Sequence, residues 1–142
     1  MKKNVIISLA DANYFLLLNE LIDSIKRFKE SEQIAICILD AGLTEEQKKD
    51  LSNKVDSIKS ADWDIEVPDS KVKGKEWLKS QVSRAFLPRY FPGYEKYLWI
   101  DADAWVNSWY PIELFLKGCE NGKLSIASSA DRALSLIHIS EP

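Results

Sequence analysis

Short apolar runs alternate with segments of helical periodicity in the first part of the chain. Residues 4–9 and residues 34–39 are apolar runs of strand length. Between them, residues 14–28 carry large apolar side chains three or four positions apart, as on one face of a helix. These side chains are Tyr14, Leu17, Leu18, Leu21, Ile25 and Phe28. The first three predicted elements are therefore a strand, a helix and a strand.

The next stretch begins with a helix-capping signal. Thr44 and Gln47 have the spacing of a capping box, in which each side chain bonds the backbone N–H of the other residue. This spacing predicts a helix that runs to about residue 54. Residues 63–67 combine a Trp, an Ile and a Val, and they predict a third strand.

A long helical pattern and a last apolar run complete the prediction. Residues 76–90 predict a helix that Pro88 must kink or end, and residues 97–100 predict a fourth strand. Strands that alternate with helices or long connections form mostly parallel sheets with right-handed crossovers. We therefore expect an α/β fold of the Rossmann-like, nucleotide-binding kind, with helices on both faces of the sheet.

Composition excludes several classes of protein. The chain has 142 residues, 46% of them hydrophobic and 29% charged, as in ordinary globular domains. A net charge of −3 provides no general field for nucleic acid, so we expect no nucleic-acid partner. No apolar run is long enough for a transmembrane segment, and we expect a cytoplasmic protein. Cys37 and Cys119 lack the spacing of a zinc site, which predicts two buried free thiols.

Two acidic residues at the end of the fourth predicted strand are the main candidate for chemistry. Asp101 and Asp103 are separated only by Ala102, and residues two apart in an extended chain point the same way. Both carboxylates would then face the crevice at the carboxyl ends of the strands, where open α/β sheets bind ligands. Two such oxygen donors suit Mg²⁺ or Mn²⁺ shared with phosphate oxygens. We therefore predict that Asp101 and Asp103 are metal ligands and catalytic residues.

This arrangement resembles the Asp-x-Asp motif of glycosyltransferases of the GT-A fold, and in particular glycosyltransferase family 8. The segment Ala10-Asp11-Ala12-Asn13-Tyr14 follows the first predicted strand and is similar to the Ala-Asp-x-Asn-Tyr segment of that family. The resemblance implies that Asp11 and Asn13 bond the uracil edge and that Tyr14 stacks on the base. The residues alone leave alternatives open. Asp11 and Asn13 are also typical of turns and helix caps, and Tyr14 also fits the apolar helix face.

Arg84 lies on the predicted helix before the Asp-x-Asp strand. Its separation from Asp101 matches that of the family arginine that contacts the donor, and a guanidinium can hold phosphate or sugar hydroxyls in a planar fork. An exposed salt bridge on a helix is the alternative. The predicted catalytic set is Asp101, Asp103 and Arg84. The predicted nucleotide-binding residues are Ala10, Asp11, Asn13, Tyr14, Arg84 and Ala102.

The resemblance covers residues 3–132, which is the donor-binding half of the family domain. The family has a third metal ligand, a histidine in a later segment, for which this chain has no matching position. Its only histidine, His138, lies in residues 134–142, which resemble the translation of a sequencing adapter. We therefore expect residues 1–133 to form the N-terminal nucleotide-sugar-binding half of a GT-A domain. We expect residues 134–142 to be a non-native tail, and we assign His138 no function.

The resemblance implies a hexosyltransferase that binds a UDP-sugar through a divalent metal and transfers the sugar with retention to an acceptor. The acceptor, whether glycan, lipid or protein, is unknown, and a donor half alone is expected to be inactive. A metal-dependent nucleotidyltransferase and a non-catalytic nucleotide-binding module are the alternatives. Nucleotidyltransferases usually carry a Gly-rich basic segment after the first strand, whereas residues 10–14 contain neither glycine nor a basic residue.

Overall fold

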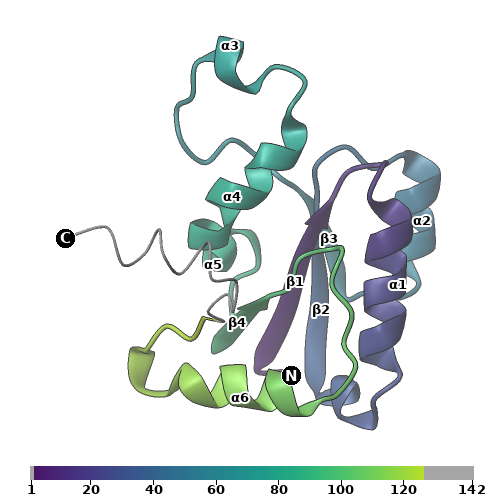
Figure 1. Ribbon diagram of the computed structural model, residues 1–142, viewed down its shortest axis with the longest axis vertical. Helices are drawn as coiled ribbons and strands as arrows, with labels where there is room; N and C mark the ends of the chain where they lie inside the picture. Colours follow the sequence, from purple (N-terminus) through teal and green to yellow (C-terminus); the bar gives the residue numbers. More distant parts are fainter. Residues whose placement is uncertain (1, 127–142) are drawn as a thin grey trace, which may run out of the picture. The chain divides into compact units, whose positions relative to one another are not determined.

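The computed structural model describes residues 2–126, so the predicted tail and His138 lie outside the described residues. The chain divides into two compact units, residues 1–109 and residues 110–142. The first unit contains a four-stranded sheet in the order β3-β2-β1-β4, in which every neighbouring pair is parallel (Figure 1). The strands are β1 (Asn4–Ala10), β2 (Ile34–Asp40), β3 (Ser57–Ser60) and β4 (Lys96–Trp99). The predicted parallel α/β sheet is therefore confirmed.

Helices connect the strands of the first unit. They are α1 (Phe15–Lys26), η1 (Lys29–Gln33), α2 (Glu45–Ser52), α3 (Asp69–Val72), η2 (Glu76–Leu78), α4 (Lys79–Ser83), η3 (Arg84–Phe86) and α5 (Leu87–Tyr90). The described part of the second unit consists of α6 (Tyr110–Gly118), η4 (Glu120–Gly122) and the residues after them up to 126. Within residues 2–126, no helix combines the length and the apolar character needed to cross a bilayer.

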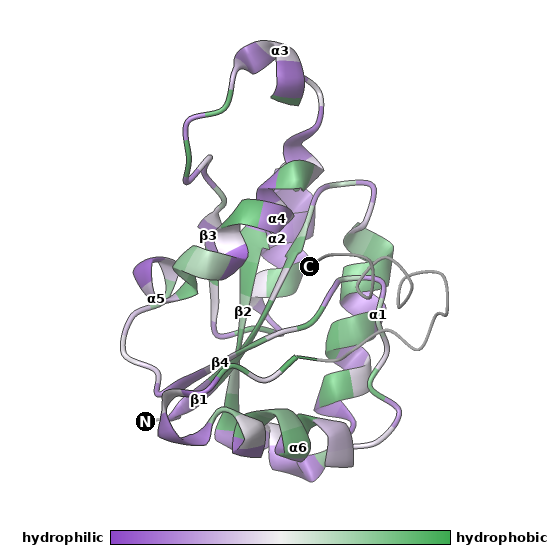
Figure 2. Ribbon diagram, turned by 60° about the vertical axis from the view of Figure 1, so that its left-hand side comes forward, coloured by the Kyte–Doolittle hydropathy of each residue, from purple (hydrophilic) through white to green (hydrophobic). Residues whose placement is uncertain are grey.

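The two central strands are buried on both faces, which explains their nearly continuous apolar sequences. Odd-numbered residues of β1 and β2 pack in one cluster with Leu87, Tyr90 and Phe91 of the α5 region. The even-numbered residues therefore face the other side of the sheet, where α1 contacts β1. Figure 2 shows the resulting contrast between the largely hydrophobic β2 and the mostly hydrophilic α3.

The buried face of α1 differs from the predicted one at its first turn. Leu18, Leu21 and Ile25 are buried as predicted, but Tyr14 is 46% exposed and Leu17 is 41% exposed. Ile22 is buried in their place. The interpretation of Tyr14 as a core residue is therefore wrong, because nearly half of its side chain stays exposed at the start of α1.

Two predicted elements need correction. The third strand lies at Ser57–Ser60, where it pairs with β2, and residues 63–67 form no strand. This edge strand is only half buried, so it needs few apolar residues and leaves little pattern in the sequence. The predicted helix over residues 76–90 is four short helical segments. Pro88 lies in the first turn of the last one, and the break comes before it at Phe86.

The connection from β2 to α2 follows the sequence closely. Thr44 and Gln47 form both bonds of the capping box, with N···O distances of 3.2 and 3.0 Å. Gly42 has a φ of 129°, which a residue with a side chain rarely adopts, and so permits the sharp turn after β2. The Nε2 of Gln47 also donates to the carbonyl of Ala12 at 3.3 Å. The start of α2 thus supports the loop that follows β1.

The two cysteines are both free. Cys37 is buried in β2, and burial raises the pKa of its thiol. Cys119 is only half buried, so the prediction of two buried thiols holds for Cys37 alone.

Candidate functional site

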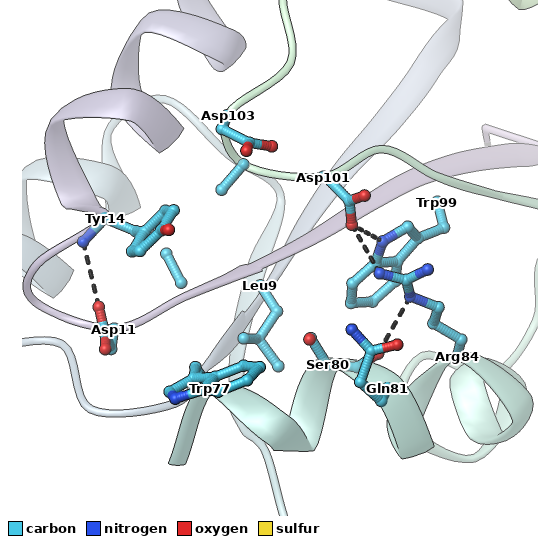
Figure 3. A pocket seen from close by; sticks show the side chains of 12 residues that line it. Leu9, Asp11, Tyr14, Trp77, Ser80, Gln81, Arg84, Trp99, Asp101 and Asp103 are labelled. Carbon is cyan, nitrogen blue, oxygen red and sulfur yellow. Dashed lines mark hydrogen bonds and ion pairs between the residues drawn. The ribbon is translucent and has the colours of Figure 1, made fainter. Parts of the chain in front are cut away.

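A pocket of about 380 Å³ lies at the carboxyl ends of β1 and β4 (Figure 3). In the order β3-β2-β1-β4, the chain moves outward from β1 to β3 and then returns to the other side of β1. Connections that leave in opposite directions open a crevice between β1 and β4, which is where open α/β sheets bind ligands. The lining residues are Leu9, Ala10, Asp11, Tyr14, Trp77, Ser80, Gln81, Arg84, Trp99, Asp101, Ala102 and Asp103. Topology thus places the pocket between two neighbouring strand ends.

The loop after β1 forms one wall of the pocket. The Oδ1 of Asp11 accepts hydrogen bonds from the backbone N–H groups of Asn13 and Tyr14, at 2.9 and 3.1 Å. Asp11 therefore has the turn-forming role that its residue type suggested, and it also lines the pocket. The half-exposed ring of Tyr14 lines the pocket too, whereas Asn13 is exposed and lies outside the lining. The structure thus brings Ala10, Asp11 and Tyr14 together but not Asn13.

The Asp-Ala-Asp segment forms a turn. Strand β4 ends at Trp99, and the N–H of Ala104 donates to the carbonyl of Asp101 at 3.0 Å. The expectation that an extended backbone aligns the two carboxylates is therefore wrong, because the chain reverses direction at this point. Ala102 is 6% exposed and anchors the turn, while Asp101 and Asp103 both line the pocket. The turn delivers the two acids to one site by a different geometry from the predicted one.

Arg84 pairs with the motif itself. Its Nη2 donates to the Oδ1 of Asp101 at 2.7 Å, and its Nε donates to the carbonyl of Ser80 at 3.1 Å. The guanidinium lies over the ring of Trp99, with its carbon 4.9 Å from the ring centroid. The Nε1 of Trp99 donates to the same Oδ1 of Asp101, also at 2.7 Å. The salt bridge expected as an alternative role for Arg84 is therefore present, and its partner is a candidate catalytic residue.

Five lining residues were not predicted from the sequence as members of the site. They are Leu9, Trp77, Ser80, Gln81 and Trp99. Trp99 lies two positions before Asp101, so the strand period could have placed it on the same side. Trp77 is an aromatic residue in a polar, charged stretch of the sequence, and this contrast could have marked it as a binding residue. In the structure its side chain is 50% exposed. Ser80 and Gln81 carry no signal of this kind.

The acids that line the pocket determine whether a divalent metal fits there. Among residues 2–126, no three His, Cys, Asp or Glu side chains form a group that could hold a metal ion. Asp101 and Asp103 therefore offer two carboxylates, and one oxygen of Asp101 is already bonded to Arg84 and Trp99. Mg²⁺ commonly takes one or two carboxylates and completes its coordination with water and phosphate oxygens. The residues fit a hydrated Mg²⁺ or Mn²⁺ shared with a phosphate, and they do not form an all-protein cage.

Comparisons with known proteins agree with this geometry. No curated protein sequence matches the chain. Similar solved structures include an active-site mutant of LgtC, with a TM-score of 0.55 at 22% identity. They also include the galactosyltransferase LgtC in complex with donor and acceptor sugar analogs, with a TM-score of 0.54 at 24% identity.

Both alignments cover 76% of this chain and 41% of the LgtC chain, so the present chain spans less than half the length of those proteins. At these identities the likeness shows a shared fold, in agreement with the expected GT-A architecture. The family model of glycosyl transferase family 8 matches residues 5–111 and includes every residue that lines the pocket. Because that match spans most of the chain, the protein belongs to glycosyltransferase family 8.

Proposed function

We propose that this chain is the donor-binding part of a glycosyltransferase, and that it binds a UDP-sugar together with Mn²⁺ or Mg²⁺. One observation carries the proposal. The pocket at the ends of β1 and β4 combines the acids Asp101 and Asp103 with a single cation, Arg84, and an exposed aromatic ring, Tyr14. These are the groups that a metal-bound diphosphate attached to a nucleobase requires.

Each lining group has a role in this proposal. Tyr14 offers a free ring face on which uracil stacks, and Asp11 lies beside it at the base end. Arg84 binds the diphosphate, and Asp101 and Asp103 hold the metal. When bound, the metal supplies positive charge that stabilises the departing nucleoside diphosphate. The hydrogen bond proposed for Asn13 has the least support, because this residue lies outside the lining.

Transfer of the sugar is proposed for the full-length protein. LgtC has been solved with donor and acceptor sugar analogs, but this chain covers only 41% of that protein. The residues proposed to bind the donor all lie within residues 5–111, which match the family model. Orientation of the reactants contributes about 7–11 kcal/mol to such reactions, so transfer requires groups that hold an acceptor in place. We assign those groups to the full-length enzyme.

Calorimetric titration of UDP into the 142-residue chain, with and without Mn²⁺, tests the proposal. We expect Mn²⁺ to raise the UDP affinity of the wild type by about tenfold, within the usual range of coupling between two ligands. Asp103→Ala should abolish this gain. Asp50→Ala is the matched control, because Asp50 is an exposed acid on α2 outside the pocket. A full Mn²⁺-dependent gain in Asp103→Ala would exclude Asp103 as a ligand.

A further inference from the structure

The carboxylate of Asp101 is bonded to the guanidinium of Arg84. Its Oδ1 accepts from Arg84 and from Trp99, each at 2.7 Å (Figure 3). Arg84 is itself held by the carbonyl of Ser80 and by the face of the Trp99 ring. A fixed positive charge therefore lies at the carboxylate that the metal is proposed to use.

The pocket contains no second cation to share this task. Among its described lining residues, Arg84 is the one basic side chain, beside the three acids Asp11, Asp101 and Asp103. A guanidinium in contact with a carboxylate neutralises its charge and repels a divalent cation that approaches the same group. Solvent screens part of this repulsion, since the side chains of Arg84 and Asp101 are 38% and 56% exposed.

We propose that Arg84 makes metal binding at Asp101 conditional on a bound diphosphate. Without nucleotide, the guanidinium stays on Asp101 and keeps the affinity for the free metal low. A diphosphate gives Arg84 a second anionic partner and brings its own oxygens to the metal, so both cations gain ligands at once. Metal and nucleotide then bind with positive coupling, which by thermodynamic linkage is equal in both directions. This inference rests on the proposed function.

Trp99 is a positioning residue for both Asp101 and Arg84. Its indole N–H fixes the orientation of Asp101, and its ring face fixes Arg84. Trp99→Phe keeps an aromatic face for Arg84 but removes the hydrogen-bond donor. We expect Asp101 to be less firmly oriented in this variant. Its affinity for the free metal should rise, but by less than in a variant that lacks the Arg84 charge.

Binding of Mn²⁺, followed by electron paramagnetic resonance of the free ion, tests the inference on the 142-residue chain without and with UDP. Arg84→Gln should bind Mn²⁺ alone about fivefold more tightly than the wild type, as expected for loss of one partly screened charge. The same variant should bind UDP more weakly and show a smaller gain in Mn²⁺ affinity when UDP is added. Arg84→Lys keeps the charge and should keep the weak affinity for Mn²⁺ alone.

Lys73→Gln is the control for a general change of net charge, because Lys73 is exposed and lies outside the pocket lining. Thermal melting shows that each variant is folded, and Trp99→Phe provides an independent test of the same contact. If the wild type gains Mn²⁺ affinity with UDP but Arg84→Gln binds Mn²⁺ alone no more tightly, the inference is wrong and the proposed function stands. A wild type without any UDP-dependent gain would overturn both.

Discussion

Two arginine–aspartate pairs involve arginines from consecutive helical segments, Arg84 in η3 and Arg89 in α5. Arg84 pairs with Asp101, and Arg89 pairs with Asp64. Each guanidinium lies over an aromatic ring. The distance from the guanidinium carbon to the ring centroid is 4.9 Å for Arg84 over Trp99 and 5.2 Å for Arg89 over Phe86. The two pairs are therefore alike in residue types and in the stacking of each guanidinium on an aromatic ring.

Their surroundings differ. The side chain of Asp64 is 0% exposed, whereas that of Asp101 is 56% exposed. Asp64 also accepts from the Tyr90 hydroxyl at 2.8 Å, and that hydroxyl accepts from the N–H of Asp62 at 3.0 Å. The Asp64 pair thus attaches the loop after β3 to α5, and the Asp101 pair faces the pocket. An arginine–aspartate pair from which water is excluded contributes to stability, whereas a pair that water can reach is available to bind ligands.

The largest expected effect is on stability. Asp64→Ala removes the acceptor of the Arg89 guanidinium and leaves the Tyr90 hydroxyl only a 3.5 Å contact with the carbonyl of Asp62. We expect a loss of about 2–3 kcal/mol in the free energy of unfolding. This value is below the roughly 3–5 kcal/mol of a fully buried pair, because the side chain of Arg89 is 58% exposed. Urea unfolding measures it. Asp101→Ala is the comparison and should cost less than about 1 kcal/mol. Equal losses in both variants would contradict the distinction between the pairs.

A second prediction concerns binding on the pocket side. Tyr14→Ala should weaken UDP binding by about 1–2 kcal/mol through loss of stacking, with little change in melting temperature because the side chain is half exposed. Calorimetry and thermal melting provide the two readouts. Leu16→Ala is the control, since Leu16 is 72% exposed on the same helix and lies outside the pocket lining. A Tyr14→Ala variant that binds UDP as tightly as the wild type would exclude stacking on this ring.

The smallest expected effect is a pH dependence of the free energy of unfolding that comes from Tyr90 and its bond to Asp64. Burial raises the pKa of Tyr90, and the neighbouring Asp64 carboxylate adds to the rise. A hydroxyl that holds its proton more tightly in the folded state contributes stability that is complete below its unfolded pKa and is lost as pH rises beyond it. Urea unfolding between about pH 9 and pH 11 should therefore show a steeper loss in the wild type than in Tyr90→Phe. Parallel curves would show that Tyr90 has an ordinary pKa.

Signals that act between near neighbours in sequence were reliable guides. The strands at Asn4–Ala10 and Ile34–Asp40 and the capping box of Thr44 were predicted because their determinants lie within a few residues. The third strand was misplaced because β3 is an edge strand that is defined by its pairing with β2 rather than by its own apolar residues.

By itself, the sequence determined the alternation of buried strands and helices, and hence the edge of the sheet at which Asp11, Asp101 and Asp103 lie. Residue patterns carry this information because burial repeats with the period of the local backbone. Only the tertiary structure decided that Arg84 bonds Asp101 over the Trp99 ring, and that Tyr14 leaves the core while Asn13 stays outside the pocket. These outcomes depend on the order of the strands and on the turn after β4, which bring together side chains from distant segments that no local pattern relates.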